Sequence, residues 1–288
     1  MRASRLHEKF IEVLTSIVSF TPLMITAFIL AFLFYNGVEV LTLEFLMSFP
    51  RKGGLEGGIL PAIIGSAYIS AICMLVAAPL GIGAGIYLAE YAPDNVITSI
   101  IRFFIECLAG IPSIVIGLFG YAFLVHGLRL GFSVLAGGLA LAFMILPWTV
   151  RVSEEAIKAV PSIYKYASLA LGATKWKTIK KVVLHAAKPM IITGMMLGLG
   201  KAVGETAVVM LTAGMGITGY LPISPLDSAR TLPVHLYIIA GEIAYTTEGL
   251  KMAYGTAIVL IMLFLAVSLP SLLLRKHFMK RVWGVGHP

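Results

Sequence analysis

Long apolar stretches alternate with short polar segments along most of the chain. A helix needs roughly 20 consecutive, mostly apolar residues to cross a bilayer. Stretches of about this length predict six membrane-spanning helices, at residues 14–36, 60–90, 99–126, 133–150, 190–214 and 252–274. The second and third are longer than a crossing requires, so we expect them to tilt or to extend past the membrane surface. The pattern predicts an all-α, polytopic membrane protein, with one transmembrane domain over residues 1–288 and its core at about 60–274.

One polar segment, Arg151 to Pro189, is much longer than its neighbours and separates the fourth and fifth apolar stretches. We expect its beginning, Arg151 to Ala159, to continue the fourth helix. After Pro161, apolar residues recur at the spacing of one helical face. Gly172 is suited to end the short helix that they form. The residues of this face are Ile163, Tyr166, Ala167, Ala170 and Leu171.

A second short helix is expected to follow, with Thr174 as its N-terminal cap and Pro189 opening the fifth membrane helix. Its apolar stripe is flanked by the four lysines Lys175, Lys177, Lys180 and Lys181. Periodicity alone leaves two interpretations open. Either the pair of helices lies on anionic lipid headgroups with lysines as anchors, or the first helix, which is short and lightly charged, inserts into a groove of a partner protein.

Composition supports the membrane class and, through the charges, a topology. The chain is 59% apolar and 12% charged, about half the charged fraction of a soluble domain, and its mean hydropathy is +0.94. With the N-terminus inside, sixteen of the 22 Lys and Arg residues lie in inner segments and five in outer ones. This bias predicts that both termini and residues 151–189 face the cytoplasm. It also accounts for the net charge of +8 without a nucleic-acid partner.

Two outer segments are longer than tight turns. Residues 37–59 are rich in glycine, and we expect them to be irregular. Residues 215–251 contain three prolines and then a short apolar run, Leu236 to Gly241. That run cannot span the bilayer, so we expect an interfacial or re-entrant helix that closes the outer side.

Charged residues inside the predicted spans are the candidates for a translocation path. Lys201 and Glu205 are four residues apart in the fifth span, so they can share a helix face and pair. An ionised group at mid-bilayer costs about 2.5–3.5 kcal/mol, so such groups face protein or a water-filled path. Two interpretations of this pair remain open, a structural strut between helices and a path that attracts anions.

Arg102 and Glu106 repeat the spacing of four residues in the third span. They are weaker candidates for the path because Arg102 lies near the inner end of the span. Hydroxyl groups of the same region, which more often bond their own backbone, are those of Ser113, Thr206 and Thr212.

Glycines four residues apart predict close helix packing, at Gly81/Gly85, Gly194/Gly198 and Gly200/Gly204. Motifs of catalysis are missing from the sequence. Gly200-Lys201 is not a phosphate-binding loop, because Ala202 stands where a magnesium-binding Ser or Thr is needed. No nucleophile elbow, metal-spaced His/Cys cluster or paired catalytic carboxylate appears. We therefore expect no catalytic residue, no metal site and no enzymatic activity in this chain.

The cytoplasmic segment resembles the coupling loop of type I ABC importer permeases. Tyr166-Ala167-Ser168, then Gly172, then Val182-Val183-Leu184 match the Glu-Ala-Ala…Gly…Ile-x-Leu-Pro pattern of that loop, with Tyr166, Ser168 and His185 as the departures. The wider strings are similar to the phosphate branch of the family, and within it to PstA-type subunits. These strings are residues 57–63, 88–92, 108–120, 167–176, 204–207 and 232–237.

The resemblance implies a function and a set of partners. It implies the permease subunit of an ATP-driven importer for inorganic phosphate, paired with a PstC-like permease, two copies of a PstB-like ATPase and an external PstS-like binding protein. ATP and magnesium would bind the ATPase and not this chain, and residues 161–172 would transmit its closure to the path. At the Lys201 position related permeases usually carry Arg, whose bidentate fork suits phosphate better. A permease for phosphonate, molybdate or sulfate, and an autonomous anion channel or carrier, remain as alternatives.

Overall fold

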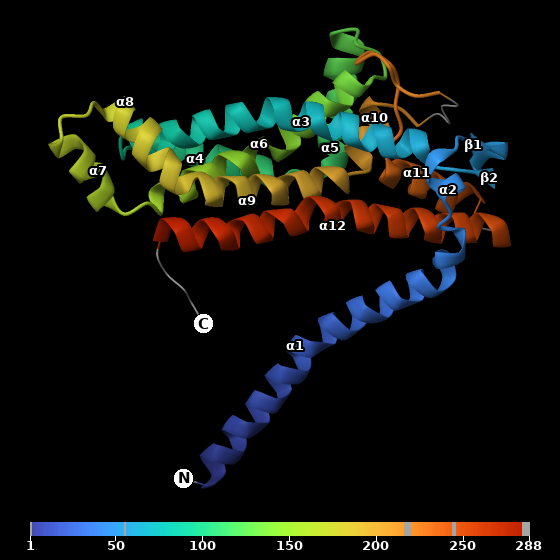
Figure 1. Cartoon of the computed structure of the whole chain (residues 1–288), viewed down its shortest axis with the longest axis horizontal. Helices are drawn as coiled ribbons and strands as arrows, with labels where there is room; N and C mark the ends of the chain where they lie inside the picture. The colour runs from blue at the N-terminus through green and yellow to red at the C-terminus, as the bar shows by residue number, and fades with distance from the viewer. Residues whose placement is uncertain (1, 55, 216–219, 244–245, 284–288) are drawn as a thin grey trace.

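The computed structural model describes residues 2–54, 56–215, 220–243 and 246–283, and these are almost entirely helical. Within them, five helices are long and apolar enough to cross a membrane, and a sixth crossing is possible if a bent pair counts as one span. The candidate spans are Ile11–Val40, Leu60–Tyr91, Val134–Lys158, Lys175–Val203 and Thr247–Pro270. They run side by side along the long axis of the molecule, except for the first (Figure 1).

The first and last helices differ in how they contact the bundle. α1 (Arg2–Gly37) approaches the bundle only near its C-terminal end, where Phe32 packs edge-on against Tyr254 at 5.7 Å between ring centroids. From there it diverges from the bundle towards the N-terminus (Figure 1). α12 (Thr247–Trp283) packs along α9 and extends well beyond the expected span of 252–274.

The third expected span, 99–126, is not a continuous helix. α4 (Val96–Ala109) and α5 (Ser113–Gly120) meet at an angle of 95°, and the π-helical turn η4 (Tyr121–Gly127) continues α5. The break falls at Gly110 to Pro112, where α4 ends at Gly110 and Pro112 takes an extended ψ of 137° before α5 begins. Proline disfavours helical geometry in the residue before it, which explains the position of the break.

The fifth expected span, 190–214, is also placed differently. α8 (Lys175–Thr178), the π-helical turn η5 (Ile179–Val183) and α9 (Leu184–Val203) form one continuous rod. The second short helix that was expected after Gly172 is therefore the beginning of the span. Pro189 lies inside the rod and does not mark its start. At the other end the rod stops at Gly204, and α10 (Ala207–Thr212) starts as a separate helix. Membrane helices tolerate an internal proline where neighbours satisfy the freed backbone.

The core of the bundle is the contact between α3 (Leu60–Ile86) and α6 (Val134–Lys158), flanked by α9. Ile69, Leu141 and Ile145 are buried at its centre. The glycine spacing predicted this packing well. A Cβ at Gly81 would lie 2.6 Å from Thr149 Cβ, and one at Gly85 would lie 2.5 Å from Ser153 Cβ. Glycine is needed at both positions because the helix backbones approach within side-chain distance.

The other two glycine pairs behave differently from each other. Gly194 and Gly198 of α9 contact Val152 and Trp148 of α6, and Gly200 contacts Phe264 of α12. Gly204 contacts no neighbouring helix and instead ends α9, so for this residue the packing prediction was wrong. Gly204 is the C-terminal cap of α9.

The end of the bundle opposite α7 (Ser162–Ala170) holds short elements (Figure 1). The described residues between 38 and 59 form η1 (Val38–Val40), α2 (Leu43–Met47), η2 (Lys52–Gly54) and an antiparallel pair, β1 (Pro50–Arg51) with β2 (Glu56–Gly57), so they are more regular than expected. The apolar run near 236–241 belongs to α11 (Leu232–Ile238) and the π-helical turn η6 (Ile239–Ile243). α11 is buried in the protein: Leu232 N donates to Ser66 Oγ of α3 at 2.8 Å.

One buried polar pair accompanies α11. Arg230 Nη1 lies 3.2 Å from His235 Nδ1, and both residues are buried. Burial, and secondly the charge of Arg230, lower the pKa of His235 to about 4. The imidazole is therefore neutral at pH 7, and its Nδ1 accepts the hydrogen bond from the guanidinium.

Candidate functional site

The short helix α7 (Ser162–Ala170) forms where the periodicity predicted it. Gly172 N donates to Leu169 O at 2.9 Å and Ala173 N to Ser168 O at 3.2 Å, a Schellman motif at the C-terminus of the helix. Gly172 has φ +81°, a left-handed conformation in which a side chain is strained, so the glycine is required at this turn. Thr174 Oγ1 then caps α8 by accepting from Lys177 N at 3.4 Å, as the sequence predicted.

The apolar face of α7 points away from the protein. Ile163 is 69% exposed, Tyr166 68% and Leu171 90%. Ala167 and Ala170 on the same face are also exposed. A helix that only completed the fold would bury this face, so the arrangement leaves an apolar surface without a covering element in the described part of the chain.

The polar side of α7 is the side attached to the membrane domain. Ser168 Oγ lies 2.9 Å from Thr178 Oγ1 of α8, so Ser168 is directed inward and not towards the exposed face. Lys165 Nζ donates to Glu90 Oε1 at the end of α3. These contacts hold α7 in a defined orientation on the bundle, and nothing in the sequence pattern indicated the Lys165–Glu90 pair, because 75 residues separate its members.

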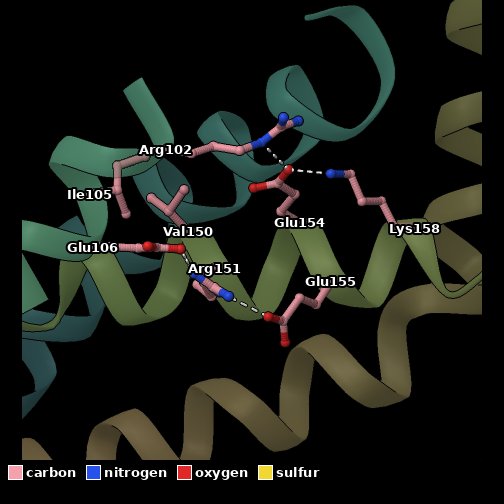
Figure 2. Close-up of a pocket in the computed structure, with 8 residues that line it drawn as sticks. All are labelled: Arg102, Ile105, Glu106, Val150, Arg151, Glu154, Glu155 and Lys158. Atoms are coloured by element: carbon pink, nitrogen blue, oxygen red, sulfur yellow. Dashed lines mark hydrogen bonds and ion pairs between the residues drawn. The ribbon is translucent and has the colours of Figure 1, made fainter. Parts of the chain in front are cut away.

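A charged pocket of about 250 Å³ lies between α4 and the C-terminal part of α6, the helix that precedes α7 in the sequence (Figure 2). Two sets of ion pairs cross it. Glu154 Oε1 accepts from Arg102 Nε at 2.9 Å and from Lys158 Nζ at 2.6 Å. Arg151 donates to Glu155 Oε1 at 2.9 Å and to Glu106 Oε1. The residues that line the pocket are Arg102, Ile105, Glu106, Val150, Arg151, Glu154, Glu155 and Lys158.

Arg102 and Glu106 therefore pair with α6 and not with each other. The spacing of four residues made an intrahelical pair possible, but α6 offers opposite charges to both side chains. Three cations and three carboxylates balance in the pocket, which leaves no net charge there to attract an anion. The geometry makes these residues a bridge that holds α4 against α6.

Lys201 and Glu205 do not pair either. Gly204 ends α9 between them, so they no longer share a helix face. Glu205 Oε1 instead accepts from Ala207 N at 3.1 Å and Val208 N at 3.4 Å, and so caps α10. In the part of the chain that the structure describes, Lys201 has no ion-pair partner, and its side chain is exposed. The structure thus leaves one free amine at the far end of the rod that begins at α8.

The two broken spans meet at α5 and α10. A Cβ at Gly117 would lie 3.1 Å from Ala207 O, and one at Gly120 would lie 2.8 Å from Thr212 Cγ2, so the two helices run in the same direction. Ser113 and Thr206 begin these helices and are half-buried. Thr212 Oγ1 donates to Val208 O of its own helix at 2.6 Å, the bond that hydroxyl groups in membrane helices favour. Ser113 and Thr206 thus lie at the N-terminal ends of the two packed helices α5 and α10. Arg102 and Glu106 instead line the charged pocket.

The site thus combines a bundle of apolar spans, breaks in two of them, and a short helix at one end whose apolar face is exposed. The family described as "Binding-protein-dependent transport system inner membrane component" matches residues 81–284, and the chain belongs to this family of ABC transporter permeases. It is therefore a multi-pass transport subunit of the membrane and not an enzyme.

Individual proteins show how close the relationship is. The probable ABC transporter permease protein YqgI of Bacillus subtilis is 38% identical over 252 residues, which cover 84% of this chain and 85% of that protein. The probable phosphate transport system permease protein PstA of Methanocaldococcus jannaschii is 36% identical over 215 residues, 75% of each chain. A chain of a bacterial alginate ABC transporter has a TM-score of 0.65 at 14% identity, covers 99% of this chain and shares its fold.

Proposed function

We propose that the chain is the permease subunit of an ATP-driven importer for inorganic phosphate. The observation that carries the transport mechanism is the uncovered apolar face of α7, which is held outward by polar contacts on its other side. The substrate is suggested by relatives whose names are phosphate transport system permease protein PstA. An exposed amine at Lys201 offers a charge that suits an oxyanion.

The position of α7 favours a protein partner over lipid. Lysines 175, 177, 180, 181 and 188 lie on the rod between α7 and its apolar part, and all are exposed. Lysines at this place extend to the headgroups of the cytoplasmic leaflet. The segment from Lys175 to Lys188 rises about 20 Å at 1.5 Å per residue. α7 lies at the end of the bundle (Figure 1), on the other side of these lysines from the apolar part of the rod, a position that suits a helix reaching past the headgroups into water.

The partners follow from the chemistry that this chain lacks. Hydrolysis of ATP takes place on a pair of PstB-like ATPase subunits, which bind the nucleotide and magnesium and receive α7 in a surface groove. A PstC-like permease supplies the second half of the path, and a PstS-like protein delivers phosphate from outside. This arrangement places both termini of the chain and residues 151–189 in the cytoplasm, in agreement with the distribution of lysine and arginine.

The continuous rod provides the mechanical connection. α7 is joined by short links to α6 on one side and to α8–α9 on the other. A displacement of α7 by the ATPase therefore moves the rod Lys175–Val203 as a unit, and Lys201 lies at its far end. Closure of the ATPase pair with ATP opens the path outward, and hydrolysis returns it inward.

Reconstitution tests this function directly. The chain alone in proteoliposomes is expected to move no phosphate, whereas the complex with permease, ATPase and binding protein takes up labelled phosphate only with ATP. Passage of phosphate through the chain alone would identify an autonomous channel and reject the proposal. Uptake of molybdate or sulfate in preference to phosphate would assign a different oxyanion.

The role of Lys201 has a separate test. We expect Lys201→Ala to lower phosphate uptake by roughly tenfold, equivalent to about 1.4 kcal/mol of lost anion attraction, and Lys201→Arg to retain uptake because the charge remains. Copurification of the ATPase should be unchanged in both variants, since α7 lies at the other end of the rod. Normal uptake by Lys201→Ala over a range of phosphate concentrations would assign the residue to structure alone.

A further inference from the structure

Besides its two chain links and the Ser168–Thr178 hydrogen bond to α8, the coupling helix α7 has a direct attachment to the end of the α3 span. Lys165 lies off the exposed apolar face of α7, and its Nζ forms an ion pair with Glu90 Oε1. The Glu90 side chain is 10% exposed and that of Lys165 is 23% exposed. Most pairs on the surface of this protein are far more open to water; Lys52–Glu56, for example, has side chains 69% and 55% exposed. A pair that is largely shielded from solvent is held more strongly than an exposed one, because breaking it leaves an uncompensated charge.

Glu90 belongs to the π-helical turn η3 (Tyr87–Tyr91), which continues α3 without a break. The next residue makes a second contact with the hairpin. Lys175 Nζ, at the start of the rod, lies 4.5 Å from the centre of the Tyr91 ring, within the range of a cation–π interaction. Both arms of the α7–α8 hairpin are therefore attached to the same turn of α3. A π-helical turn inserts an extra residue into a helix and is frequent at functional sites.

α3 connects this turn to the outer side of the protein. It packs along the length of α6 and, at its outer end, Ser66 accepts from Leu232 N of the buried helix α11 at 2.8 Å. In the same region a Cβ at Gly65 would lie 3.2 Å from the carbonyl carbon of Arg230. α3 is thus one rod with a cytoplasmic end fixed to α7 and an outer end fixed to α11.

We infer that Glu90 and Lys165 are positioning residues that transmit the displacement of α7 to α3, and through α3 to the outer segment around α11. This inference rests on the proposed function, in which the ATPase moves α7. The chain links connect α7 directly to α6 and to the rod of α8–α9, and α3 is otherwise reached only through its packing on α6. The ion pair adds a direct connection from α7 to α3, so that the displacement of α7 reaches α3 without loss through the α3–α6 contact and the outer side responds to the nucleotide.

The test uses the complete complex of both permeases, ATPase and binding protein in proteoliposomes. The variants are Glu90→Gln, Lys165→Met and the charge exchange Glu90→Lys with Lys165→Glu. Phosphate uptake, ATP hydrolysis and copurification of the ATPase are measured for each. Each single variant is expected to lower the phosphate imported per ATP hydrolysed by at least about fivefold, the lower range of energetic coupling between sites, with the ATPase still bound. The exchange variant is expected to recover most of that ratio.

The matched control is Lys52→Met, which removes the exposed outer pair with Glu56 and should leave the ratio unchanged. A normal ratio in Glu90→Gln and Lys165→Met, with the ATPase bound, would overturn the inference. So would a loss of ATPase binding that accounts for all the lost uptake, because the pair would then only maintain the fold. Failure of the proposed function is distinguishable, since it would appear in the unmodified complex as uptake that is independent of ATP.

Discussion

A single carboxylate on the exposed face of α7, Ala167→Asp, is expected to abolish ATP-driven uptake while the membrane domain remains folded. Ala167 lies between Ile163, Tyr166 and Leu171, which form the apolar surface that a partner would cover. Covering this surface would bury the new charge without a counter-ion, at a cost of about 3 kcal/mol or more. That corresponds to roughly a hundredfold weaker association with the ATPase.

Ser162→Asp is the matched control for this prediction. Ser162 is exposed on the same helix but lies off the apolar face, and an acidic group in the first turn of a helix interacts favourably with the helix dipole. Copurification of the ATPase and uptake in proteoliposomes are measured for both variants. Equal uptake by Ala167→Asp and the unmodified chain would show that α7 is not the docking element, and the interfacial-hairpin interpretation would then apply.

The second large effect is expected in the core, at the glycines of α3. Gly81→Val and Gly85→Val should each destabilise the protein by about 3 kcal/mol, the cost of severe overpacking. At Gly81 the new Cβ meets Thr149, and at Gly85 it lies 2.9 Å from the backbone nitrogen of Glu154, which cannot move without shifting α6. The melting temperature of the purified chain in detergent should fall by roughly 6–12 °C.

Gly83 provides the control on the same helix. A Cβ at Gly83 meets nothing within 4 Å, so Gly83→Val carries the same change of residue type without the contact with α6. We expect its melting temperature to remain close to that of the unmodified chain. Similar losses in all three variants would mean that valine destabilises α3 itself, and that close approach of the two helices is not the reason.

The helix α7 could be predicted from the sequence because its signals are local. The apolar spacing after Pro161, the glycine at 172 and the hydroxyl of Thr174 act through hydrogen bonds and dihedral angles within a few residues. The same holds for Gly81 and Gly85, whose spacing along one helix is sufficient to indicate a close packing face. These features appear in the structure where they were expected.

The two pairings expected within single helices, Lys201 with Glu205 and Arg102 with Glu106, are not found in the structure, because they assumed unbroken helices and partners on the same helix. Lys201 and Glu205 are four residues apart in sequence, but Gly204 lies between them and ends α9. Arg102 and Glu106 are on one helix, yet they pair with Glu154 and Arg151 of α6 and not with each other. An ionised side chain pairs with the nearest opposite charge in space, and a single sequence does not state which helices are neighbours.

By itself, the sequence determined the membrane class, the apolar stretches and the short helix after Pro161 with its glycine stop. These depend on composition and on contacts within one or two helical turns. Only the tertiary structure decided where the spans break, which charges neutralise one another and how α3 is joined to α7. Such features arise when segments as distant as Glu90 and Lys165 are brought together. Their physical cause is helix packing, which is a property of several segments at once and is not encoded in the period of any one of them.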